Sequence, residues 1–315
     1  MKVLHITNNY PTPNFPIFGI FVKEQIDSLS ALGVENEVFF INGREKGKLE
    51  YVKSIFRLRK FLKGQQYDIV HCHHSLSAIC LILSGKYKRY KTIVSYQSNP
   101  LNEQGTQLYE FIRRKLRYVI LKCALPIIDN KNIFYQPNGV DINFFSVYEK
   151  EDCLLKLNLN KDKQYILFVS SNYVRKEKRY DKFQLLLRIL RNKYNLEDIE
   201  ELKLVNTERS LVPYYFNAAS LHLLTSDFEG SPNSVKEAMA CNTPVVSTNV
   251  GNVDELLSNV EGSFVSRTSD VDELADLAYK ALTFQGQQNG REVLIKQELD
   301  MESVARKIIK IYNQL

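Results

Sequence analysis

Two acidic residues, Glu229 and Glu237, are separated by seven residues in a stretch that runs from an apolar segment through a polar loop into a helical pattern. Glu237 falls about one turn inside the expected helix, where a carboxylate can accept hydrogen bonds from two neighbouring ribose hydroxyls. Glu229 falls in the loop, where it is nearer to a bound sugar. A simpler interpretation is that both acids only support a helix start, because acidic side chains stabilise helix N-termini.

The residues between Glu229 and Glu237 can form a binding site for an anion. Gly230 lets the backbone turn sharply, and Pro232 fits an early helical position because its missing N–H costs nothing there. Asn233 and Ser234 then present backbone amides at the helix start, where the amides and the helix dipole favour a phosphate by about 0.3–1 kcal/mol. The stretch therefore predicts a site for a sugar nucleotide.

Strands and helices must hold these residues in place, and the sequence predicts both in alternation. In the first half, strands are expected at residues 2–7, 38–41, 68–71 and 92–96, and helices at 21–32, 51–62, 78–83 and 108–122. In the second half, strands are expected at 165–169, 202–205, 221–225 and 244–247, and helices at 182–193, 211–218, 234–240, 271–282 and 303–312.

This alternation predicts an α/β fold of two doubly wound, Rossmann-like domains with a cleft between them, the usual ligand site of such sheets. We expect one domain at residues 1–145, a second at 146–300, and a final helix at 301–315 that packs back toward the first. No GxGxxG follows the first strand and no GxxxxGK[ST] occurs, so a dinucleotide or P-loop site has no motif behind it.

The composition of the chain indicates its cellular compartment and the charge of its partner. The five cysteines are scattered in apolar contexts, which is typical of buried thiols rather than a disulfide framework. No run of eighteen apolar residues and no secretory leader pattern is present, so we expect a soluble cytoplasmic protein. Residues 1–150 hold 21 Lys and Arg against 12 Asp and Glu, and residues 151–315 hold 21 against 24, so the first half suits an anionic partner.

Several segments resemble the retaining glycosyltransferases of family 4, which have the GT-B fold and use nucleotide-activated sugars. EGSPNSVKEAMACNTPVVSTNVGNVDEL (229–256) is similar to the E-x7-E segment of that family and the elements that follow it. The interdomain segment of the family is similar to QPNGVD (136–141). Its donor-domain strand and Arg/Lys loop are similar to FVSSNYVRKEKRYDKF (168–183), and its glycine loop and first helix are similar to NNYPTPNFPIFGIFVKEQIDSLSALG (8–33).

The resemblance implies roles for individual residues. Glu229 would face the donor sugar, and Glu237 would hold the ribose. Lys178, with Arg175 as a looser match, would pair with the diphosphate, and Gly19 would bring a backbone N–H to it from the other domain. The first domain would be the acceptor side and the second the nucleotide-sugar side, with Glu229 and Lys178 as the catalytic residues.

Some positions depart from the family pattern. Gln97 stands where the family often has a histidine, Asn252 replaces the second glycine of a pair, and Tyr173 replaces an arginine. Only residues 207–210 separate a strand from the next helix, where the family usually has a further strand and helix.

Contacts to the acceptor or the sugar are predicted for His73, Gln97 and Asn138. His74 is an alternative to His73 for this contact. The other interpretation is that the histidine has a structural role.

Two patterns suggest a metal. His71, His73 and His74 lie close together, but adjacent strand residues face opposite ways and no second cluster supplies partners, so we expect no metal site. Asp270 and Asp272 form a DxD sequence at the start of an amphipathic helical pattern, where capping is the better interpretation.

Basic residues around Arg113, Arg114 and Arg117, with Lys86 and Lys88 nearby, suit either an anionic membrane surface or an ordinary solvated face. No nucleic-acid module is recognisable, so we expect no nucleic-acid partner.

The predicted function is a metal-independent, retaining transfer of a sugar from a nucleoside diphosphate, UDP or GDP, to a glycan or glycolipid. We expect a role in surface polysaccharide synthesis in the cytoplasm or at the inner face of the membrane, without a cofactor. The alternatives are a sugar-nucleotide epimerase or phosphorylase on the same fold, and an inactive scaffold or partner subunit.

Overall fold

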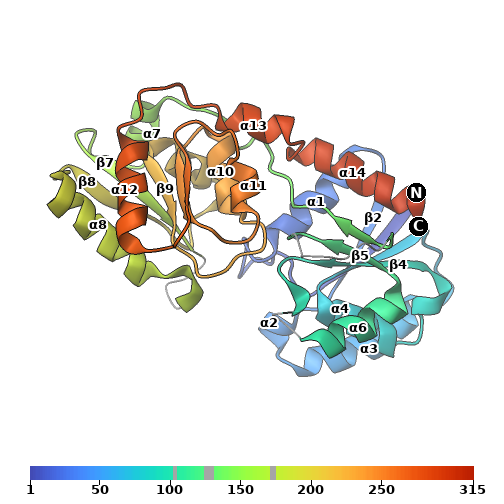
Figure 1. Ribbon diagram of the computed structural model, residues 1–315. Coiled ribbons are helices and arrows are strands. Elements are labelled where there is room, and N and C mark those ends of the chain that lie inside the picture. Colours follow the sequence, from blue (N-terminus) through green and yellow to red (C-terminus); the bar gives the residue numbers. More distant parts are fainter. Residues whose placement is uncertain (102–104, 124–130, 171–174) are drawn as a thin grey trace. The chain divides into compact units, whose positions relative to one another are not determined.

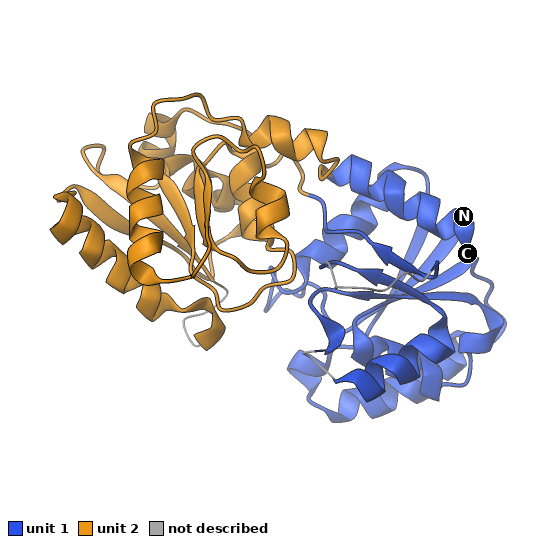
Figure 2. Cartoon of the chain, in the orientation of Figure 1, with its two compact units in different colours: residues 1–139, 301–315 blue, residues 140–300 orange. Residues whose placement is uncertain are grey.

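The computed structural model describes residues 1–101, 105–123, 131–170 and 175–315, which form two compact units (Figures 1 and 2). Unit 1, blue in Figure 2, contains residues 1–139 and 301–315, and unit 2, orange, contains residues 140–300. The sequence predicts a boundary between residues 145 and 146, whereas the units change between 139 and 140. The C-terminal helix belongs to unit 1.

Unit 1 is built on a parallel sheet of six strands in the order β2-β1-β3-β4-β5-β6. The strands are β1 (Lys2–Thr7), β2 (Glu35–Phe40), β3 (Ile69–His73), β4 (Lys91–Tyr96), β5 (Tyr118–Leu121) and β6 (Ile133–Tyr135). β1, β3 and β4 are buried almost throughout, because the sheet is covered by helices on both faces.

The two faces of this sheet carry separate hydrophobic clusters. Val3 packs with α1 (Ile20–Ala31) and α14 (Met301–Gln314), whereas its neighbour Leu4 packs on the opposite face, as successive strand residues must. That opposite face is covered by α3 (Leu49–Phe61), α4 (Ser75–Leu83) and α6 (Thr106–Leu116), after the short α2 (Gly43–Lys46) (Figure 1).

Unit 2 is built on a parallel sheet of five strands in the order β11-β10-β9-β7-β8. The strands are β7 (Gln164–Val169), β8 (Ile199–Leu204), β9 (Leu221–Leu224), β10 (Val245–Thr248) and β11 (Phe264–Ser266). α8 (Tyr180–Tyr194) and α12 (Val271–Leu282) cover one face, and the other face carries α7 (Lys150–Lys156), α9 (Val212–Ala218), α10 (Asn233–Ala240), α11 (Val253–Leu257) and α13 (Gly290–Lys296).

Both sheets follow one winding rule. In each unit the first strand lies between the second and the third, so the direction of winding reverses between β1 and β3 and between β7 and β9. Doubly wound sheets bind ligands beyond the carboxyl ends of the strands at such a reversal. The structure confirms the predicted fold class of two Rossmann-like units.

One predicted element is wrong. The helix expected at 108–122 ends at Leu116, and Tyr118–Leu121 is the strand β5. Arg117 has a positive φ of 64°, which stops the helix, and the apolar run that follows is buried between β4 and β6. The short connection in unit 2 is confirmed, since β8 ends at Leu204 and α9 begins at Val212.

No helix within the described ranges is long and apolar enough to cross a bilayer.

Candidate functional site

An ion pair spans the winding reversal of unit 2. Lys178 ends a short 3-10 helix, Lys176–Lys178, in the segment after β7, and Glu229 lies in the loop after β9. Their Nζ and Oε1 atoms are 2.5 Å apart, and both side chains are largely buried. The Ser226 hydroxyl donates a second hydrogen bond to the same carboxylate oxygen at 2.7 Å. The two residues predicted to act in catalysis are therefore brought together.

The backbones that carry this pair are joined directly. The Thr225 hydroxyl donates to the Lys178 carbonyl at 2.9 Å, and the Asp227 amide donates to the Glu177 carbonyl at 2.8 Å. Arg179 adds an ion pair to Asp227 at 3.0 Å. Because both loops are fixed to one another, the position of Lys178 relative to Glu229 is set by the fold as well as by the ion pair.

Glu237 has a partner that the sequence analysis did not identify. It lies on α10, and its Oε1 is 2.9 Å from Nη1 of Arg209, which begins the short 3-10 helix Arg209–Leu211. The Arg209 guanidinium also lies 4.9 Å from the ring centre of Phe145 and 5.4 Å from that of Phe144, which fits cation–π contact. Arg209 therefore holds Glu237 in a fixed place.

The N-terminus of α10 has no side-chain cap, and the Ser234 hydroxyl is used elsewhere. Nδ1 of His222 lies 3.2 Å from the Leu167 carbonyl, which can only accept, so this nitrogen donates. Burial, helped by the charge of Lys178, lowers the pKa of His222 to about 4, so the ring is neutral and its Nε2 accepts from the Ser234 hydroxyl at 3.1 Å. Oδ1 of Asn233 is buried and has no partner within the described part of the chain. The first amides of α10 thus remain available for an anion.

A close backbone contact supports the Glu229 loop. Gly251 has a φ of 58°, and a Cβ at this position would lie 2.2 Å from the Gly230 carbonyl oxygen. Only glycine fits both the conformation and the space. The loop after β10 is thereby pressed against the loop that carries Glu229, with Asn252 buried beside it.

Arg175 is partly exposed and pairs with Glu177 at 2.5 Å, so it does not join the Lys178 pair. Tyr173, which replaces an arginine of the family pattern, lies outside the described residues.

Gly19 lies at the winding reversal of unit 1, where it precedes α1 with a φ of 69°. A Cβ there would lie 2.3 Å from the Asn9 carbonyl carbon, so the loop after β1 closes tightly on itself. The structure requires glycine at this position whatever ligand its amide meets.

Gln97 and Asn138 are also brought together. The Asn138 amide nitrogen donates to Oε1 of Gln97 at 2.8 Å, which joins the segment after β4 to the segment after β6. His73 differs, because it is 2% exposed and lies inside unit 1. A side chain enclosed to this degree does not reach a sugar, and the structural interpretation of His73 fits the geometry better.

The histidine cluster is assembled differently from the expectation. β1 supplies His5, whose Nδ1 is 3.0 Å from Nε2 of His73, and the ring of His71 stacks on that of His73 at 4.2 Å. His5, on a second strand, therefore lies beside His73 as a further possible metal ligand. The expectation that no other segment would supply such a residue is wrong. Burial lowers the pKa of all three histidines, so the rings are neutral.

The surroundings of this cluster do not suit a cation. Both ring nitrogens of His71 are occupied, by the Tyr312 hydroxyl and the Ser95 hydroxyl, each at 2.6 Å. Lys122 is fully buried nearby with its Nζ 3.0 Å from Oε1 of Gln25, and burial lowers its pKa to about 7. A metal would displace existing hydrogen bonds and lie near the Lys122 amino group, which is positively charged below its pKa of about 7, so we assign the cluster to the internal hydrogen-bond network.

The DxD sequence is confirmed as a helix cap. The Asp270 carboxylate accepts hydrogen bonds from the amides of Asp272 at 2.8 Å and Glu273 at 3.4 Å, and α12 begins at Val271 as expected.

Two glycosyltransferase families match this chain. Residues 163–283 match the family described as glycosyl transferases group 1, and residues 20–130 match the family described as glycosyl transferase 4-like.

Curated relatives and solved structures agree with these matches. A galactosyltransferase of Escherichia coli that acts on α-D-GlcNAc-diphosphoundecaprenol is 24% identical over 70% of this chain and 68% of its own length. A probable sucrose-phosphate synthase of Thermosipho melanesiensis is 32% identical over 49% of this chain and 40% of its own length. The sucrose-phosphate synthase structure from Thermosynechococcus elongatus superposes with a TM-score of 0.76 at 16% identity, covering 100% of this chain and 99% of that one. Anabaena HepE in complex with UDP and glucose superposes with a TM-score of 0.69 at 14% identity, covering 99% of each chain.

Proposed function

Because this chain is a family 4-like glycosyltransferase of the GT-B fold, we propose that it transfers a sugar from a nucleoside-diphosphate sugar to a hydroxyl of a glycan or glycolipid, with retention of the anomeric configuration. The observation that carries this proposal is the ion pair of Lys178 and Glu229 at the winding reversal of unit 2. The pair lies at the edge of the sheet where doubly wound folds bind ligands.

In the proposed donor complex, the diphosphate competes with Glu229 for Lys178. The Lys178 ammonium turns to the diphosphate, and the released carboxylate of Glu229 accepts hydrogen bonds from the sugar hydroxyls. Negative charge grows on the leaving diphosphate during transfer, so this ammonium acts where the transition state needs it. A charge-assisted hydrogen bond of this kind contributes about 1.5–3 kcal/mol.

The remaining donor contacts follow from unit 2. Glu237, held by Arg209, accepts from the ribose hydroxyls, and the amides of Asn233 and Ser234 receive a phosphate at the start of α10. Arg175 leaves Glu177 for the diphosphate. With these cationic and amide groups the diphosphate charge is met by the protein itself, which supports a metal-independent transfer.

The proposed donor is a UDP-sugar, a choice supported by solved structures of the same fold, which include HepE with UDP and with UDP-glucose. The E. coli relative is named for a diphosphoundecaprenol acceptor, which favours a lipid-linked acceptor here. Such an acceptor would place the reaction in surface polysaccharide synthesis at the cytoplasmic face of a membrane.

A thermal-shift panel of UDP-, GDP-, ADP- and dTDP-sugars without divalent metal tests the donor site. We expect stabilisation by a UDP-sugar that is lost in Glu237→Ala and kept in Glu261→Ala, an exposed acid of the same unit. Indifference to every nucleotide would replace this function with the inactive scaffold. Turnover of a sugar nucleotide into its epimer without an acceptor would indicate the epimerase, and the anomeric configuration of the transfer product, read by NMR, tests retention.

A further inference from the structure

The exposed side of α3 carries three large apolar residues, which is unusual for a helix that covers a sheet. Leu49, Val52 and Phe56 are 71%, 52% and 69% exposed, and their spacing of three and four residues places them on one stripe. The opposite stripe, with Ser54 and Leu58, is buried against the sheet. The outward apolar stripe therefore contributes nothing to the core of unit 1.

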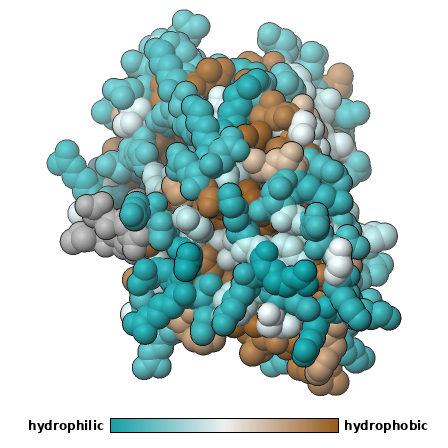
Figure 3. All heavy atoms as spheres, turned by 90° about the vertical axis from the view of Figure 1, so that its right-hand side faces the viewer, coloured by the Kyte–Doolittle hydropathy of each residue, from teal (hydrophilic) through white to brown (hydrophobic). Residues whose placement is uncertain are grey.

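Neighbouring helices extend this apolar surface. α3 packs against α4, and α4 packs against α6, so the three helices form one layer. Leu76 and Leu83 on α4 are 40% and 59% exposed, and Phe111 on α6 is 44% exposed. We call the surface formed by Leu49, Val52, Phe56, Leu76, Leu83 and Phe111 the α3–α4–α6 face. In Figure 3, brown and tan atoms show among teal ones along the lower edge of the molecule, on the side where Figure 1 places these helices.

Cations surround the apolar residues. Residues 46–63 contain seven Lys or Arg and one acid, Glu50, which is buried and paired with Arg57. Lys53 and Lys60 lie on the exposed stripe of α3. Residues 84–91 add four more Lys or Arg and no acid. The charge exposed along α3 is thus of one sign.

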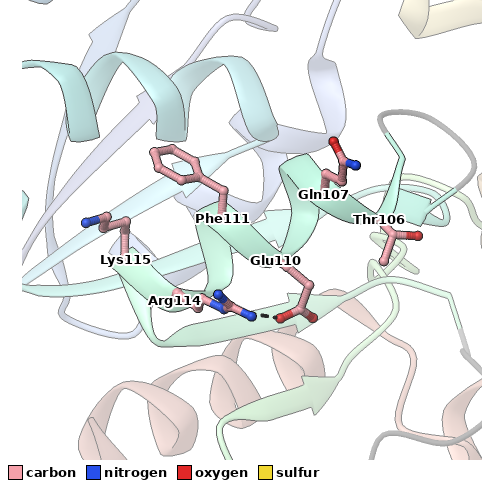
Figure 4. Close-up of a pocket in the computed structure, with 6 residues that line it drawn as sticks. All are labelled: Thr106, Gln107, Glu110, Phe111, Arg114 and Lys115. Atoms are coloured by element: carbon pink, nitrogen blue, oxygen red, sulfur yellow. Dashed lines mark ion pairs between the residues drawn. The ribbon is translucent and has the colours of Figure 1, made fainter.

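The outer surface of α6 repeats this composition beside a hollow of about 610 Å³ (Figure 4). Phe111, Arg114 and Lys115 line the hollow together with Glu110. Glu110 is already neutralised, because Arg113 pairs with it at 2.7 Å and Arg114 lies 3.9 Å away. An apolar ring with cations beside it is the combination found where lipid headgroups meet acyl chains.

We propose that the α3–α4–α6 face docks on an anionic lipid bilayer. Leu49, Val52 and Phe56 enter the boundary between headgroups and acyl chains, and Lys53 and Lys60 meet anionic headgroups. Charge complementarity selects this occupant, since a second copy of the chain would bring like charges together across the contact. The inference extends the lipid-linked acceptor of the proposed function, and its vesicle-binding test requires neither donor nor acceptor.

Flotation of the full-length chain with vesicles tests the docking. We expect binding to vesicles of phosphatidylglycerol and phosphatidylcholine, little binding to phosphatidylcholine alone, and weakening by salt. The double variant Leu49→Ser/Phe56→Ser should bind at least tenfold more weakly. Lys53→Glu/Lys60→Glu should lose at least as much, because one Lys near an anionic surface accounts for roughly a fivefold change.

Matched controls lie in unit 2. Leu155→Ser, at an 81% exposed position on α7, and Lys161→Glu/Arg188→Glu should bind vesicles as the unmodified chain does. Circular dichroism melting checks that each variant folds. Vesicle binding that survives the α3 substitutions, or equal binding to uncharged vesicles, would overturn the docking face. A dimer in sedimentation that Leu49→Ser/Phe56→Ser dissociates would assign the face to self-association instead. Transfer to a short soluble acceptor should be unchanged in the α3 variants, which separates this result from a failure of the proposed function.

Discussion

Lys178 and Glu229 are 51 positions apart in the chain, yet the Lys178 ammonium nitrogen lies 2.5 Å from a carboxylate oxygen of Glu229. The contact exists because β7 and β9 are neighbours in the sheet, so the segments that follow them leave from the same edge. A diphosphate that binds Lys178 must therefore replace the Glu229 carboxylate as its anionic partner.

Replacing Lys178 with Ala should lower kcat/KM by roughly 10–150-fold, because about 1.5–3 kcal/mol of charge-assisted hydrogen bonding to the leaving diphosphate is lost. Initial rates at several donor concentrations measure this change. Lys161→Ala, at an exposed site of the same unit, is the control. Wild-type rates for Lys178→Ala would remove this residue from the donor site.

Arg209→Ala should raise the KM for the donor roughly tenfold with kcat little changed, because Glu237 loses the partner that positions it. Arg209→Lys should recover part of this loss, since it keeps the charge but not the planar contact with Phe145. Calorimetric titration with UDP separates a binding effect from a chemical one. Equal affinity in the Ala variant and the unmodified chain would contradict the positioning role.

The buried histidines predict a loss of stability in mild acid. The pKa of His222 is lowered to about 4 in the folded chain, below its ordinary value of 6.5, so the unfolded chain takes up the proton first. Stability from this residue is present above pH 6.5 and falls by about 1.4 kcal/mol per pH unit toward pH 4. Urea unfolding from pH 7.5 to 4.5 measures the slope.

The variant His222→Gln isolates this contribution from those of His5, His71 and His73, whose pKa values are also lowered. It should be less stable than the unmodified chain at pH 7, and the difference should shrink as the pH falls. A difference that is constant with pH would show that His222 does not titrate in this window.

Asp270→Ala should lower the free energy of unfolding by about 1 kcal/mol, because α12 loses its cap. Activity should be unchanged, with or without added divalent cations. Asp272→Ala is the matched control within the same DxD sequence, because it keeps the backbone amide that donates to the Asp270 carboxylate. Loss of activity in the Asp270 variant would instead indicate that the DxD sequence binds a metal.

The sequence predicts a helix or a strand well where the apolar residues follow only one periodicity, either helical or extended. The helix expected at Val271–Leu282 has those bounds in the structure, because a cap and an amphipathic pattern agree there. The error at 108–122 arises because the residues of β5 also fit a helical spacing. Burial between two strands and the positive φ of Arg117 decide the outcome, and both depend on the folded sheet.

The candidate site was predictable only in part. Glu229, Glu237 and Lys178 follow from local motifs, but no pattern in the chain pairs Lys178 with Glu229. Arg209 was missed because it lies in a short connection that no motif marks. His222 and Lys122 stand as single polar residues in apolar segments, and such residues signal a buried hydrogen bond without naming the partner.

The return of α14 to unit 1 has a consequence for the order in which the chain folds as it is made. Val304 and Ile308 complete a core that contains Val3, and the Tyr312 hydroxyl is a partner of His71 in the interior. The ribosome makes these residues after all of unit 2, which is one continuous stretch. Unit 2 can therefore fold once its own residues have left the ribosome, whereas unit 1 keeps an incomplete core until α14 has also emerged.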